Sequence, residues 1–145
     1  MENGLTLYNV TANESGAPYT SLLAESEDTA LLLYKAMNNP DESLGDHINE
    51  IVTIRHIFIQ PVELPNQETG EVQVCPRIVL ISDDGTTYVT ISKGVYNSLK
   101  NLCAIIGTPE TWKAPVKVKV IQRAIKERKM LSLDAVDFGG NLNHD

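Results

Sequence analysis

The pattern of apolar and polar residues predicts a run of β-strands from residue 51 onward. Residues 51–59 are rich in β-branched and aromatic side chains, and their apolar phase changes near His56, as it does at a β-bulge. Pro61 limits ladder pairing, so we expect this strand to bend or to reach a sheet edge there. After a polar turn at residues 66–70, further strands are predicted over residues 71–75, 77–81 and 86–91.

One amphipathic helix and two more strands follow. Ser92 is a suitable N-cap, and Gly107 is a suitable end for a helix between them. Its apolar face is formed by Val95, Leu99, Leu102, Cys103 and Ile106. After Trp112 the period returns to two: valines at 116, 118 and 120 face one way, and Lys117 and Lys119 face the other. Residues 131–135 repeat this alternation and predict a last strand.

The N-terminal part of the chain is harder to assign. Residues 1–28 are polar and predict a loosely ordered arm, residues 29–136 the packed domain, and residues 137–145 a short acidic tail. The stretch Thr29–Met37 follows Ser26, a plausible N-cap, and propensity favours a helix. Nine residues could equally form a buried strand.

The order of these elements is strands, one helix, then two strands. A five-stranded Greek-key barrel with its helix between the third and fourth strands is the OB arrangement, which binds oligonucleotides on an open face. The sequence therefore predicts a mainly β OB-fold.

Composition narrows the class of protein. A chain of 145 residues with 42% hydrophobic and 21% charged residues suits one globular domain. The net charge of -7 is unevenly distributed: residues 1–54 hold nine acids against Lys35 alone, whereas residues 113–130 hold seven cations against Glu127. The basic stretch is either a solvated strand face or a groove for a polyanion.

Several classes are disfavoured. No apolar run is long enough to span a membrane and the N-terminus lacks the order of a secretory signal, so we expect a cytoplasmic protein. Cys75 and Cys103 lack metal or disulfide spacing and are expected to be reduced and buried. No histidine, glycine or serine motif indicates a metal, a phosphate cradle or a nucleophile, so we expect neither an enzyme nor a cofactor.

Cations beside aromatic rings are what a single strand of nucleic acid requires, because phosphates bind cations and unstacked bases bind flat apolar faces. If Thr87, Val89 and Ile91 pack inward, Tyr88 projects to the opposite face as a stacking platform; an ordinary half-buried tyrosine is the alternative. Trp112 is either a second platform or a cap of the barrel. Candidate phosphate contacts are Arg55, Arg77, Lys117, Lys119 and Arg123.

Several short strings in one order resemble the small single-stranded DNA-binding proteins of bacteriophages and prophages, and more distantly the one of protein-primed Bacillus phages. They are DGTTYVTISK (84–93), GVYNSLKNL (94–102) and WKAPVKVKVIQ (112–122), with LYKAMNNP (33–40) and IQPVEL (59–64) upstream.

The resemblance covers roughly residues 29–136 and implies that residues 31–36 form the first barrel strand, so we take strand over helix there. Tyr88 matches a tyrosine that the family uses against bases, and Lys93, Lys117 and Lys119 match its lysines. Residues 60–64 lack the further tyrosines of the protein-primed relatives, so Phe58 or Trp112 would have to supply base contact there.

The resemblance implies a protein that coats single-stranded DNA without reading its sequence during phage replication or recombination. The acidic tail is a candidate contact for replication or recombination proteins, and a frayed terminus is the alternative. A non-enzymatic protein-interaction module, such as a replisome adaptor or anti-host factor, is the rival function. The oligomeric state does not follow from the sequence.

Overall fold

The protein is mainly β, as the sequence predicts. A computed structural model of the chain describes residues 19–66, 68–125 and 128–142. In chain order the elements are β1 (Tyr19–Thr20), α2 (Glu27–Asn38), β2 (Glu42–Ser43), the 3-10 turn η1 (Leu44–His47), β3 (Ile51–Pro65), β4 (Val72–Ser82), β5 (Thr87–Thr90), α3 (Lys93–Ile106), the 3-10 turn η2 (Pro109–Thr111), β6 (Val116–Ile125) and β7 (Arg128–Asp137).

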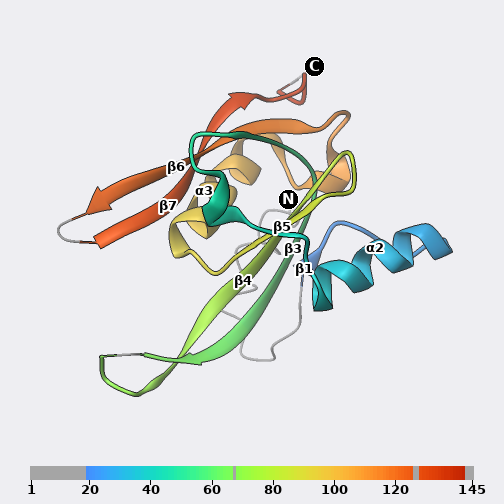
Figure 1. Cartoon of the computed structure of the whole chain (residues 1–145). Helices are drawn as coiled ribbons and strands as arrows, with labels where there is room; N and C mark the ends of the chain where they lie inside the picture. Colours follow the sequence, from blue (N-terminus) through green and yellow to red (C-terminus); the bar gives the residue numbers. More distant parts are fainter. Residues whose placement is uncertain (1–18, 67, 126–127, 143–145) are drawn as a thin grey trace.

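The seven strands of the described residues belong to one curled, mixed sheet (Figure 1). Its order is β2-β5-β4-β3-β6-β7, and β1 pairs with β3 outside this path. β2 is parallel to β5, and the other strand pairings of the described residues are antiparallel. The first residues of β3 pair with β6 and the rest with β4, so β3 belongs to both halves of the sheet. The β3–β4 and β6–β7 hairpins project toward the same side of the molecule (Figure 1).

β3 contains the bulge that its sequence predicts. The register of the β3–β4 ladder shifts between Ile54 and His56, which leaves Arg55 without a partner on β4. The expected sheet edge near Pro61 is confirmed: β3 continues to Pro65, but from Gln60 onward it pairs with β4 alone among the described residues. Pro61 lies opposite Pro76, and a non-hydrogen-bonded position of an antiparallel ladder needs no N–H from either residue.

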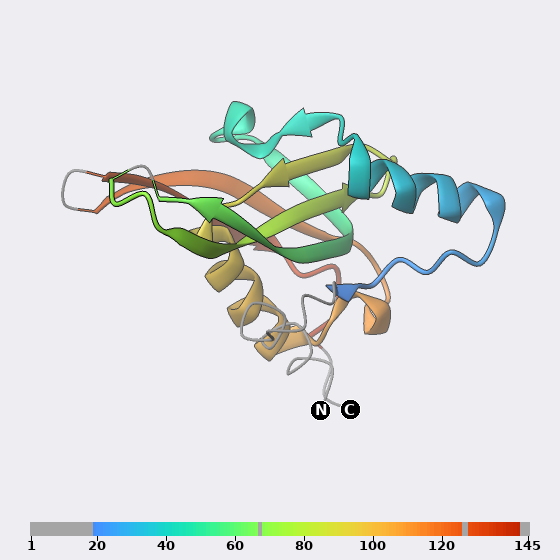
Figure 2. The ribbon, with the colours of Figure 1, turned by 90° about the horizontal axis from the view of Figure 1, so that it is seen from below.

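The main core lies on the inner face of the curled sheet, where α3 packs. Inner residues of the sheet include Val52, Ile54, Ile57, Ile59, Ile78, Leu80, Val116, Val118 and Val120, and α3 contributes Val95, Leu99, Leu102, Cys103 and Ile106. Figure 2 shows α3 on one side of the sheet and β2 with η1 on the other. The period of α3 and its start after Ser92 are confirmed, and both cysteines are free and buried.

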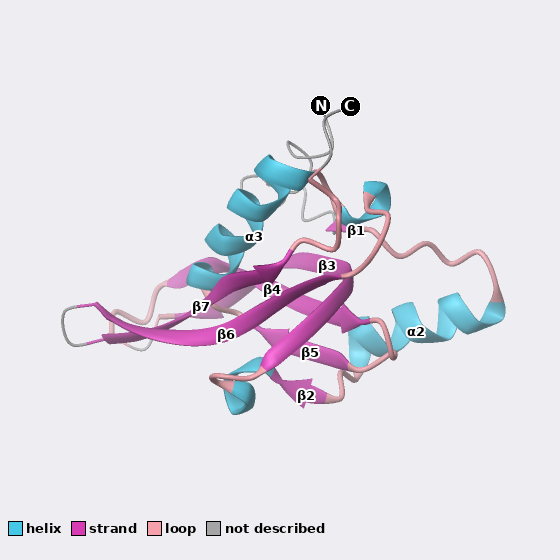
Figure 3. Cartoon of the chain, turned by 90° about the horizontal axis from the view of Figure 1, so that it is seen from above, coloured by secondary structure: helices cyan, strands magenta, loops and turns pink. Residues whose placement is uncertain are grey.

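α2 corrects the strand that the resemblance implies over residues 31–36. Ser26 and Thr29 form a capping box, and acids occupy the first turn, so local signals for a helix are strong. α2 packs against the outer face of β3, β4 and β5 through a second apolar cluster (Figure 3). This cluster is formed by Leu22, Leu32, Leu33, Ala36, Phe58, Val79, Ile81 and Val89. Propensity was therefore the better guide.

β7 is an edge strand whose free backbone groups are bonded by α3. Ser92 Oγ donates to the Leu131 carbonyl at 3.1 Å, and the backbone N–H of Leu133 donates to Ser98 Oγ at 3.1 Å. Gly94 permits this approach, because a Cβ there would collide with the Leu131 carbonyl oxygen. α3 thus protects the edge from pairing with another chain.

Packing begins before residue 29. Residues 1–18 of the predicted arm lie outside the described residues, but Tyr19 and Leu22 are buried. The Tyr19 hydroxyl donates to Glu110 Oε1 at 2.6 Å, and burial, with Glu110 beside it, raises the pKa of Tyr19 well above its usual range. At the other terminus, the side-chain amide of Asn141 donates to the Ala114 carbonyl at 2.9 Å, so the start of the predicted tail also packs.

Candidate nucleic-acid interface

β6 places its lysines on the face opposite the core. Val116, Val118 and Val120 are buried, whereas Lys117 is exposed and Lys119 half-buried. Side chains of a strand alternate between its two faces, so both lysines lie on the outer face. The predicted division of this strand into an apolar and a cationic face is confirmed.

The neighbouring strands place one uncharged residue and one acid beside each lysine. On β3, Thr53 is in register with Lys117 and Ile51 with Lys119. On β7, Asp137 is in register with Lys117 and Asp134 with Lys119. Among the described residues neither lysine is within ion-pair distance of a carboxylate. Both ammonium groups are therefore unpaired, although Asp134 and Asp137 offset part of the local potential.

Two more cations lie toward the β6–β7 hairpin. Arg123 is exposed near the end of β6 and is in register with Met130. Lys93 is exposed at the first position of α3, next to Gly94, where Met130 packs. We call Lys93, Lys117, Lys119 and Arg123 the cationic track.

Arg55 lies at the bulge of β3, near the Lys117 end of the track. It is half-buried, follows Thr53 by two residues, and so shares the outer face. Its Nη1 is buried and has no hydrogen-bond partner among the described residues. Burial and the Arg55 charge both lower the pKa of the adjacent His56, so this imidazole is mainly neutral at neutral pH.

Arg77 is separated from the track by the curvature of the sheet. It lies on the outer face of β4, and its Nη1 donates to the Ala36 carbonyl at 3.2 Å. Burial lowers the pKa of Arg77. A cation at the carbonyl end of α2 stabilises that helix, so this arginine has a structural contact.

Tyr88 is half-buried on the inner face of β5, where it packs against the main core. Its ring meets the His47 ring edge-on, with centroids 5.1 Å apart. Partial burial, with the charges of Asp84, Glu42, Glu50 and Asp41, raises its pKa. Tyr88 and Val89 alternate, but their faces are the reverse of those expected: Val89 packs under α2, and Tyr88 packs against the main core among acids.

Trp112 is buried within the core, with 5% of its surface exposed. Its indole Nε1 donates to the Gly107 carbonyl at 2.8 Å. The ring therefore joins the end of α3 to the start of β6. Stacking of Trp112 on a base stays a prediction, and the buried ring is not accessible to a base in this conformation. Phe58 is likewise buried, under α2.

Comparison with known proteins identifies the family of this chain. Residues 13–135 match a family model described as phage single-stranded DNA-binding protein, of the phi29 type. The chain belongs to this family. Searches of curated proteins and of solved structures found no match.

Other chemistry finds little support in this phage single-stranded DNA-binding protein. Within residues 19–66, 68–125 and 128–142 no group of histidines, cysteines and acids is arranged to hold a metal ion. No helix in those ranges is long and apolar enough to cross a membrane. Burial, with the charge of Glu110, raises the pKa of Cys103 to about 12, so its thiol is not a nucleophile at neutral pH.

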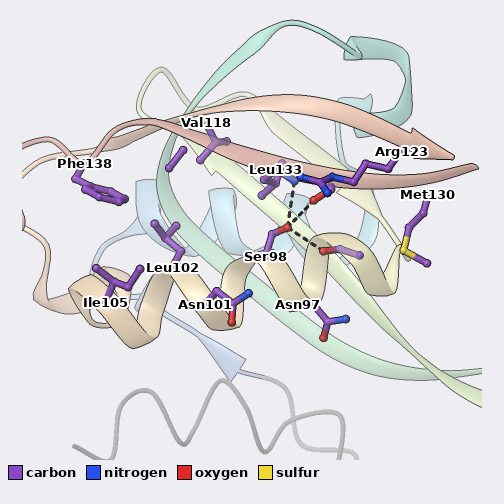
Figure 4. Close-up of a pocket in the computed structure, with 13 residues that line it drawn as sticks. Asn97, Ser98, Asn101, Leu102, Ile105, Val118, Arg123, Met130, Leu133 and Phe138 are labelled. Carbon is purple, nitrogen blue, oxygen red and sulfur yellow. Dashed lines mark hydrogen bonds between the residues drawn. The ribbon is translucent and has the colours of Figure 1, made fainter. Parts of the chain in front are cut away.

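Sequence reasoning missed a pocket of about 430 Å³ between α3 and β7 in this family member (Figure 4). Asn97 and Asn101 line it from α3, Arg123 lies near one end, and Phe138 lies near the other. The two asparagines are four residues apart and lie beside the apolar face of the helix. This spacing was the one indication of a polar pocket rim in the sequence. Phe138 was assigned to the tail, but it packs against the core.

Proposed function

We propose that this protein coats single-stranded DNA without reading its sequence, during phage DNA replication or recombination in the host cytoplasm. Family membership supports single-stranded DNA as the ligand. The observation that carries the proposal is the cationic track, whose four side chains form no ion pair among the described residues of an otherwise acidic protein. Such cations bind phosphates without reading bases.

We infer that the five long strands form an OB-type barrel. Their order β5-β4-β3-β6-β7, with α3 following β5 in the chain, supports this assignment. Among the described residues β5 and β7 do not pair with each other. The β2–η1 segment contacts both β5 and β6, and α3 forms hydrogen bonds to the edge of β7. The barrel would therefore be closed by these segments.

The location of the track follows from what α2 covers. OB-folds commonly bind oligonucleotides on the face of their second and third strands. In this protein the corresponding outer face of β4 and β5 lies beneath α2 and its apolar cluster. Among the described residues no helix covers the outer face of β6 or of the start of β3 that pairs with it (Figure 3). We therefore expect the single strand to follow β6.

The spacing of the lysines suits an extended strand of DNA. Lys117 and Lys119 are two residues apart on β6, a rise of about 6.6–6.8 Å, so they can meet successive phosphates. Arg123 and Lys93 would contact phosphates farther along. The half-buried guanidinium of Arg55 would contact a phosphate at the other end of the track through its accessible atoms.

A titration of labelled oligo(dT) followed by fluorescence anisotropy tests this proposal. We expect affinity at low salt, a steep loss of affinity as salt is added, and weaker binding to a duplex of equal length. Anisotropy is preferable to tryptophan emission, because Trp112 is buried. Absence of binding at low salt, or equal affinity for the duplex, would refute the proposal.

Base stacking by Tyr88 remains a prediction and needs two variants. Tyr88→Phe keeps the ring, so it should keep affinity if the ring stacks on a base. Tyr88→Ala removes both stacking and core packing, so its thermal stability must be measured in parallel. A loss of stability with unchanged affinity would assign Tyr88 to the core alone.

A second candidate function has one observation in its favour. The outward side of α2 exposes Leu31, Tyr34 and Met37, with 59%, 66% and 41% of their surfaces accessible. An apolar stripe of this kind, beside the acids of the first turn, suits a protein partner such as a replisome component. This interaction module would predict no affinity for oligo(dT) and loss of partner binding on Tyr34→Ala.

A further inference from the structure

The pocket between α3 and β7 has the composition of a small-molecule site. Its volume of about 430 Å³ falls within the ~300–1,000 Å³ typical of ligand pockets. Leu102, Leu133 and Phe138 form apolar walls, and the asparagines form a polar rim (Figure 4). An apolar slot with a few polar groups at its rim suits a flat heteroaromatic ring.

The rim groups are free to bind a ligand. Ser98 Oγ is already bonded to Gly94, Ser132 and Leu133. By contrast, the side-chain amides of Asn97 and Asn101 have no hydrogen-bond partner within the described residues. Each amide offers both a donor and an acceptor, and its rotation can match the edge of any base.

Arg123 connects the pocket to the cationic track. It lines the pocket near Met130, with which it is in register, and it follows Lys119 by four residues on β6. A nucleotide whose base enters the pocket would place its phosphate at this end, where the guanidinium can bind it. The remaining strand would then continue along β6 toward Lys117.

We propose that this pocket receives one unstacked base of the bound single strand, with Arg123 on its phosphate and Asn97 and Asn101 on its edge. This rests on the proposed function, since it names a base subsite for the same ligand. The site is tolerant of sequence, because the walls are apolar and the amides can turn. It gives the protein a base contact that does not depend on Tyr88 or Trp112.

The test compares oligo(dT) with an abasic oligonucleotide of equal length, for the wild type and two pocket variants. Asn101→Trp fills the slot, and the double variant Asn97→Ala with Asn101→Ala removes the amides without disfavouring the helix. Ala104→Trp is the matched control, because residue 104 is exposed on α3 and does not line the pocket. Thermal unfolding verifies that each variant is folded.

The wild type should prefer oligo(dT) over the abasic strand by at least about fivefold, the lower end for one stacked base. Both pocket variants should reduce this preference toward one, with the salt dependence unchanged because no charge is lost. The control should behave as the wild type. If the pocket variants keep the wild-type preference for oligo(dT), as Ala104→Trp should, the base subsite is refuted while single-stranded DNA binding stands. If the wild type binds neither strand, the proposed function itself fails.

Discussion

Replacing Lys119 with alanine should reduce the salt dependence of single-stranded DNA binding by a calculable amount. If the four cations of the track each neutralise one phosphate, the slope of log K against log salt is about -2.8, since single strands release ~0.7 counterion per contact. A fourfold rise in salt then lowers affinity ~50-fold. Removing one cation lowers the slope to about -2.1 and that loss to ~18-fold, and removing Lys117 as well lowers the slope to about -1.4.

The assay is anisotropy of labelled oligo(dT) at several salt concentrations between about 50 and 200 mM, the range over which such slopes are measured. Lys35→Ala is the control for net charge: its Nζ lies 2.8 Å from Asp41 Oδ2 on another part of the surface. This control should leave the slope unchanged. Equal slopes for Lys119→Ala and the wild type, or a change with Lys35→Ala, would refute the assignment of the track to phosphates.

Three further outcomes are expected. Asp134→Asn should raise affinity at low salt about twofold to fivefold, since it removes the acid in register with Lys119; a titration at fixed salt measures this. Arg77→Ala should lower the free energy of unfolding by ~1–3 kcal/mol in a urea titration, because it breaks a charged hydrogen bond to α2, and should leave the salt slope unchanged. Hydrogen bonds to Glu50 and Glu42 raise the pKa of His47 in the folded protein. The stability that this histidine contributes is therefore full below about pH 6.5 and is lost as the pH rises through its folded-state pKa. His47→Gln should flatten the pH dependence of the thermal midpoint in this window.

Local patterns predicted the local structure well. Period two gave the faces of β6, the phase change near His56 gave the bulge, and Ser92 with Gly107 gave the bounds of α3. Each depends only on neighbours in the chain. The error at residues 31–36 arose because the resemblance was preferred over a capping box whose Ser26 and Thr29 are three residues apart.

The candidate site was harder, because it depends on which side of the sheet each strand presents. Alternation correctly separated Tyr88 from Val89, but it could not show that α2 would cover the outer face at Val89 and leave Tyr88 facing the core. Arg77 was grouped with the other cations by charge alone, whereas its hydrogen bond is to α2. The pocket at Asn97 and Asn101 forms only when α3 meets β7, about 30 residues later in the chain, and no local pattern records that contact.

The contrast between the track and the acidic remainder has a consequence for binding at very low salt. With a net charge of -7, the whole protein repels DNA, and the track attracts it only at short range. At 0.1 M salt the screening length is ~10 Å, so distant acids are hidden and the nearby cations dominate. At 0.01 M the length is ~30 Å, comparable with the molecule, and the repulsion opposes binding. The plot of log K against log salt should therefore flatten below roughly 0.02 M. A straight line into that range would mean that the acids do not act on the bound strand.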